Sequence, residues 1–287
     1  MKLKPFLSLL ATASLGISVL SPPTAANAQT SPACPDPSLV TSVNTNGDAT
    51  SFEALTGGGG TCSGTPDTYA VTVYKMGVCA SDPAPSSGAA DYSSCSITYE
   101  DESGTSANFS AGTSMGLSES LSSRPEDGTY GYAVILIGTT FNIKAQYGPI
   151  ADGSNTIFYS TSTSTGWPAS ANTTGPATAE PVTANSFGDN CDSQDSLTIA
   201  AGTLTGTILD ASGERIPDSS SASTCTGATY ILGVVELSSP VTIDSSVSSL
   251  DATFTVTNNG TTLNIDNSGG IIFDAGPFNV TLSVVRD

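Results

Sequence analysis

Apolar and polar residues alternate along much of this chain. In residues 68–76, TYAVTVYKM, the side chains of Tyr69, Val71 and Val73 fall on one face and those between them on the other, which is the period of a β-strand. The same pattern predicts strands at residues 96–100, 196–209, 229–237, 251–257, 261–266 and 278–285. Helical stripes are nearly absent, because Ser, Thr, Gly, Pro and Asn interrupt the longer segments. The chain is therefore predicted to be an all-β, antiparallel β-sandwich of Ig-like or jelly-roll-like type.

The most apolar stretch is GTYGYAVILIGTTFNIKAQYG, residues 128–148. From Tyr130 to Ile137 both alternating sets are apolar, which predicts a central strand that is covered on both faces. From Phe141 to Tyr147 apolar and polar residues alternate, which predicts a half-exposed strand. A bulge or tight turn at Gly138 is expected to join the two parts.

Composition divides the chain into segments. Residues 160–189 are rich in Ser, Thr, Ala and Pro, so 161–188 is predicted to be a linker or long loop between a β domain at 67–160 and a second at 189–287. One extended sandwich is the alternative. Residues 29–66, which contain GGGG at 57–60, are predicted to form an extended N-terminal arm.

Residues 1–28 are predicted to be an export signal, since Lys2 and Lys4 precede an apolar run and Ala26-Asn27-Ala28 forms an A-x-A cleavage site. Cleavage there would leave 5 basic and 26 acidic residues, a net charge of −21. Nucleic acid and anionic membrane surfaces are unlikely partners for such a chain, and no membrane insertion is expected after cleavage.

Export would place the cysteines where thiols oxidise. The even number predicts three disulfides, of 15 possible connectivities, and closeness in sequence favours pairing each cysteine with its neighbour in this order: Cys34, Cys62, Cys79, Cys95, Cys191 and Cys225.

A resemblance to other secreted proteins is in line with the predicted export. The run Tyr69-x-Val71-x-Val73-x-Lys75-x-x-x-Cys79, followed by PEDGTYGYAVILIG and TFNIK, resembles uncharacterised secreted β-sandwich proteins of marine and other bacteria. In those proteins a G-T-Y entry precedes a buried strand. The resemblance implies an extracellular or envelope β-sandwich and supplies no catalytic residue.

Candidate chemistry is sparse. The chain has no histidine, which excludes Ser-His-Asp and Cys-His catalysis and His-containing zinc sites. Asp189, Asp192 and Asp195 in DNCDSQD are interpreted as an acidic turn, with calcium binding as the alternative. Trp167 is interpreted as a hydrophobic plug for its loop, with stacking on a ligand such as a sugar as the alternative. No enzyme activity and no required cofactor are predicted.

These features predict a secreted structural protein that self-associates into an extracellular filament or surface layer by β-strand complementation. Residues 29–66 and residues 278–285 are the candidate donor strands. The alternative is a monomeric adhesin or a glycan- or protein-binding module.

Intact-mass analysis of the exported protein should show a chain that begins at Gln29 and lacks one hydrogen for each of its 6 cysteines. Free thiols at Cys79 and Cys95 would contradict the pairing by sequence neighbourhood.

Overall fold

A computed structural model describes residues 31–45, 47–109, 123–161, 171–188, 190–199, 201–266 and 269–286. Within them, helix is limited to the short turns η1 (Pro37–Leu39) and α1 (Phe52–Leu55). The strands are β1 (Thr61–Gly64), β2 (Thr68–Cys79), β3 (Cys95–Asn108), β4 (Gly128–Lys144), β5 (Gln146–Tyr147), β6 (Phe158–Tyr159), β7 (Glu180–Thr183), β8 (Gln194–Ile199), β9 (Gly202–Leu209), β10 (Tyr230–Ile243), β11 (Val247–Thr255), β12 (Thr261–Ile265), β13 (Ile271–Ala275) and β14 (Asn279–Arg286). The strands of each sheet pair antiparallel, and the all-β prediction is confirmed.

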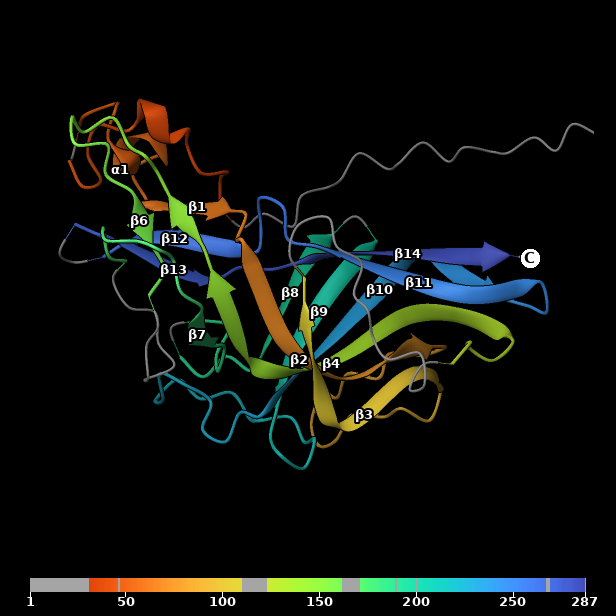
Figure 1. Cartoon of the computed structure of the whole chain (residues 1–287). Helices are drawn as coiled ribbons and strands as arrows, with labels where there is room; N and C mark the ends of the chain where they lie inside the picture. Colours follow the sequence, from red (N-terminus) through yellow and green to blue (C-terminus); the bar gives the residue numbers. More distant parts are fainter. Residues whose placement is uncertain are drawn as a thin grey trace, which may run out of the picture.

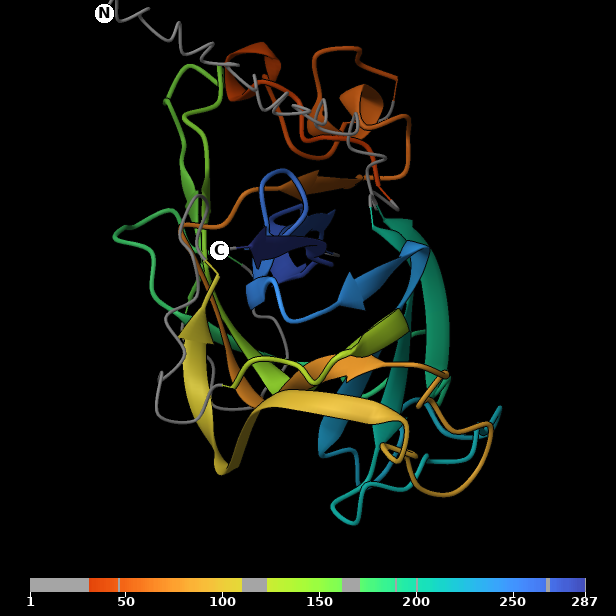
Figure 2. The same cartoon turned by 90° about the vertical axis from the view of Figure 1, so that its right-hand side faces the viewer.

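Seven of the described strands form the main sheet, in the order β3-β2-β4-β10-β9-β8, with β7 paired to the end of β4. This sheet is strongly curved, and β11 and β14 lie as a paired ribbon on its concave side (Figures 1 and 2). At the other end, β12 pairs with both β1 and β13 (Figure 1). Phe254 of β11 and Val280 of β14 belong to the same buried core as Ile135 of β4. The ribbon therefore covers the inner face of the curved sheet.

β4 has the central place that its two apolar faces predict. It lies between β2 and β10. Ala133, Ile135 and Ile137 belong to the main core, whereas Val134 lies in a second cluster together with Leu232. Against β2, Val73 pairs with Ile137 but Val71 pairs with Phe141, so the register shifts at the predicted position around Gly138.

The two halves of the sequence form one sheet. β4 comes from the first half and β10 from the second, and they pair from Tyr230↔Gly138 to Ile243↔Gly128. Part of segment 161–188 also joins this sheet, because Val182 of β7 pairs with Phe141. Residues 67–160 and 189–287 therefore share one sheet and one core rather than folding as separate domains.

The N-terminal segment is folded, which corrects the prediction of an extended arm. β1 pairs with β12 from Thr61↔Asn264 to Gly64↔Thr261. Val40 and Phe52 are completely buried, and the Phe52 ring meets Tyr147 edge-on, with ring centroids 5.4 Å apart. The GGGG run supports this packing: glycines at 57, 58 and 60 adopt positive φ, so the chain turns back from α1 into β1.

Phe52→Ala should lower the free energy of unfolding by about 3–5 kcal/mol, because it removes a fully buried ring from the core. Urea unfolding followed by circular dichroism would measure the change. Leu39→Ala is the matched control, since Leu39 lies in the same segment but is 58% exposed. Equal, small effects of both substitutions would show that the segment does not belong to the folded core.

Candidate functional site

The disulfides are Cys34–Cys62, Cys79–Cys95 and Cys191–Cys225, the pairs that closeness in sequence favours. The first lies within the N-terminal segment and joins Cys34 to Cys62 of β1, and the second joins paired residues of β2 and β3. The third links the loop before β8 to the loop before β10. Such cross-links fit a protein that folds in an oxidising compartment.

Of the residues considered as acidic or aromatic ligands, the structure describes Asp192 and Asp195. Asp192 lies in the loop before β8, and Asp195 lies within β8. Asp189 and Trp167 fall outside the described residues. Within the described chain, no three His, Cys, Asp or Glu side chains are placed to hold a metal ion together.

Open strand edges are the main candidate feature for interaction in the described chain. Among these residues, β3 and β8 each have one strand neighbour in the main sheet, and β11 and β14 have only each other. An unpaired edge exposes backbone donors and acceptors to which another extended segment can bind. The edges of β3 and β14 differ in how well their side chains prevent such pairing.

The edge of β3 is protected. Glu100, Asp101 and Glu102 lie inside this strand. Lys75 Nζ is 2.6 Å from Glu100 Oε1, and the register with β2 shifts twice. Charged side chains and bulges are the devices by which proteins block edge pairing.

The edge of β14 lacks these devices over residues 279–285. The strand reads NVTLSVVR, so it has no charged residue before Arg286 and no proline. Its pairing with β11 is in register from Asn279↔Thr255 to Val285↔Ser249. Thr281 and Ser283 are exposed, and Val285 is 39% exposed. β14 is therefore the longest uncharged open edge in the described chain.

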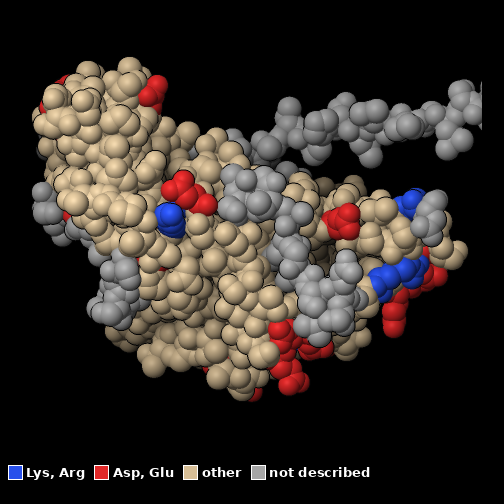
Figure 3. Space-filling model, in the orientation of Figure 1, with Lys and Arg blue, Asp and Glu red and all other residues tan. Residues whose placement is uncertain are grey.

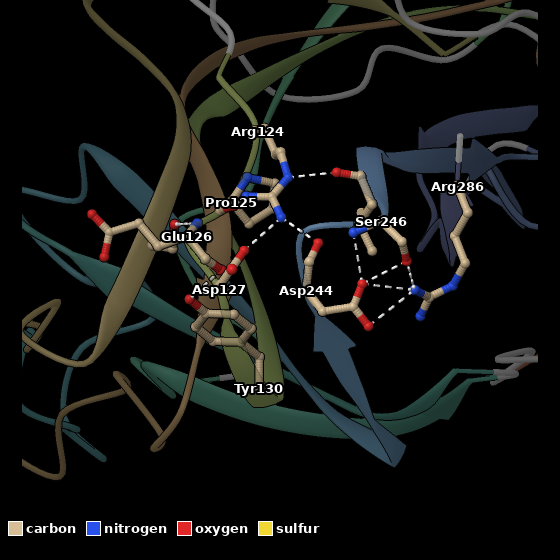
Figure 4. Close-up of polar contacts among 10 residues, drawn as sticks. Arg124, Pro125, Glu126, Asp127, Tyr130, Asp244, Ser246 and Arg286 are labelled. Carbon is tan, nitrogen blue, oxygen red and sulfur yellow. Dashed lines mark hydrogen bonds and ion pairs between the residues drawn. The ribbon is translucent and has the colours of Figure 1, made fainter.

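A polar clamp fixes the end of this ribbon (Figure 4). Arg286 Nη1 donates to Asp244 Oδ1 at 3.0 Å and to Ser246 Oγ at 2.6 Å, which ties β14 to the β10–β11 turn. Arg124, which precedes β4, donates through Nε to the Val247 carbonyl at 2.5 Å and through Nη2 to the Asp244 carbonyl and to Asp127 Oδ1. The clamp holds β14 in place, and the outer edge of β14 has no strand partner among the described residues.

Charged groups are few on the face shown in Figure 3, where small acidic groups are separated by large uncharged areas. In the described chain, four of the basic side chains form ion pairs with acidic ones: Lys75, Arg124, Arg215 and Arg286. These cations are thus already engaged within the monomer.

The comparisons with known proteins identify no relative. No family model matches the chain, and neither the curated proteins nor the solved structures include a match. Among the described residues, no helix has the length and apolar character needed to cross a membrane.

Asp244→Asn should make the protein less stable at neutral pH. Hydrogen bonds from Ser246, followed by those from Arg286, lower the pKa of Asp244 from 3.8 to about 2. Because the folded-state pKa is depressed, this contribution is present above about pH 4 and is lost as the pH falls toward 2. Acid unfolding curves of the two proteins should therefore differ at neutral pH and converge near pH 2.

The exposed Asp67, just before β2, supplies the control substitution Asp67→Asn. If both variants behaved alike across this pH range, the clamp would make no specific contribution to stability.

Proposed function

We propose that this protein is a secreted, non-catalytic structural subunit that assembles into an extracellular filament or surface layer through its open strand edges. The observation that carries the proposal is the outer edge of β14, which is uncharged, in register and unpaired among the described residues. Backbone pairing along such an edge adds several hydrogen bonds at once.

We favour a different contact segment from the N-terminal arm that the sequence suggested. Residues 29–66 are packed into the monomer through the pairing of β1 with β12 and the burial of Phe52 against Tyr147, so they are not a free donor. β14 is paired with β11 and clamped by Arg286. Pairing edge to edge requires neither segment to leave its place, and we therefore favour it over donation of a strand.

A filament requires contact between two different surfaces, because a surface that pairs with its own copy closes into a dimer. β8 offers the second edge: it is the last strand of the main sheet in the described chain, and residues 196–199 are uncharged. Pairing of β14 with β8 of the next copy is heterologous and can repeat without closing. We assign these two edges as the polymer contacts.

The double variant Thr281→Lys, Ser283→Lys should fold but fail to polymerise, whereas the wild-type mature protein should form regular filaments. Both side chains are exposed on β14, and lysine on an edge strand hinders the approach of another strand. Electron microscopy and light scattering at increasing protein concentration would measure assembly.

Ser238→Lys, Ser239→Lys is the matched control. It adds the same charge at exposed positions of β10 that lie in the bulge between Glu236 and Val241, outside the two assigned edges. This control should polymerise like the wild type. A wild-type protein that stays monomeric at high concentration would refute the proposal and favour an adhesin or binding module, and assembly of the β14 variant would refute the assigned edge.

A further inference from the structure

A cavity of about 510 Å³ lies between the inner face of the main sheet and the connection from β13 to β14. Its wall on the sheet side comes from β2, β4, β8, β9 and β10, and the loop after β7 closes another side. Cavities of this size bind small organic molecules in other proteins. The cavity lies apart from the outer edge of β3 and the clamp around Asp244.

Four aromatic rings line the cavity: Tyr69, Phe141, Phe187 and Phe278. A Cβ on Gly206 would lie 2.8 Å from Phe187 Cζ, so this glycine is what allows the ring to pack against β9. The Tyr69 hydroxyl donates to the Gly276 carbonyl at 2.9 Å and is therefore satisfied within the protein. The cavity thus offers aromatic surface with few polar contacts.

The charges of the lining are all of one sign. Asp195 and Asp274 contribute carboxyl groups, and no lysine or arginine is among the described residues of the lining. Asp274 Oδ1 accepts a hydrogen bond from the amide of Ala275 at 2.7 Å, and the residue is half-buried. Burial raises the pKa of this carboxyl, which reflects the difficulty of keeping it charged without a partner.

We propose that this cavity binds an apolar organic amine, with its body against the aromatic rings and its ammonium group at Asp274. An ammonium can donate to this carboxyl group and offsets the unfavourable burial of its charge. Aromatic faces also attract cations. A fatty acid or another apolar anion would meet two carboxyl groups and no cation, so anionic ligands are disfavoured.

Three fluorescent probes that share one dansyl body and one alkyl tail separate these possibilities: dansylcadaverine, its N-acetyl derivative and dansyl-aminohexanoic acid. Titration of the mature protein should give a blue-shifted fluorescence increase with the amine. The neutral probe should bind at least about tenfold more weakly, equivalent to about 1.4 kcal/mol, and the acid more weakly still. Absence of binding by all three, or equal binding of the acid and the amine, would overturn the proposal.

Two variants locate the binding. Ala184→Phe adds a ring at the cavity wall and should abolish the fluorescence increase, while Ala151→Phe adds the same ring at an exposed position and should leave it unchanged. Asp274→Asn should reduce binding of the amine to the level of the acetylated probe without weakening the latter. An unaltered preference for the amine in Asp274→Asn would overturn the role of this carboxyl.

Circular dichroism of each variant would establish that it is folded. If Ala184→Phe or Asp274→Asn does not fold, competition on the wild-type protein still decides the question. Unlabelled octylamine should displace dansylcadaverine and octanoic acid should not, whereas displacement by both to the same extent would contradict the proposal.

Discussion

Hydrogen bonding of one strand that is apolar on both faces governs this structure. β4 has buried side chains on its two faces, so its peptide groups need neighbouring strands to bond to. β2 lies along one edge of β4 and β10 along the other. Because β10 lies in the second half of the chain, the requirement of this one strand draws both halves into the same sheet. The N-terminal segment, the ribbon and the loops all pack onto the sheet that results.

The same need of backbone groups for hydrogen-bond partners applies to the edges of the ribbon formed by β11 and β14. The curvature of the main sheet leaves a concave face. The two-stranded ribbon of β11 and β14 lies on this face (Figure 2). β14 has an apolar and a polar set of side chains but no charge that would prevent another strand from pairing with it. β3 also has an edge without a strand partner among the described residues, but it carries three consecutive acidic residues. Within one chain, therefore, one edge is protected and another is left open.

Sequence patterns predicted the strands whose side chains are buried on one or both faces of a sheet. The two-faced apolar run of β4 and its irregularity at Gly138 follow from side-chain periodicity alone. The folded N-terminal segment was missed because α1 has only four residues, too few for a helical period, and because glycine runs are also typical of flexible linkers. β7 was missed for a similar reason, since its EPVT sequence lies in a Ser/Thr/Pro-rich segment. The cavity could not be predicted, because its lining comes from strands that only the folded topology brings together.

Electrostatics and edge pairing act over different ranges in this protein. With a net charge of −19 for the full sequence, two copies repel each other at long range, and this repulsion weakens within a Debye length of about 8 Å at physiological salt. The basic side chains that could attract a neighbouring acidic surface are mostly held in ion pairs within the monomer. In the proposed assembly, attraction between copies would come from short-range contacts, and the edge of β14 before Arg286 offers backbone pairing that salt screens poorly. An acidic surface with one uncharged edge thus disfavours random association while permitting a contact that forms only in register.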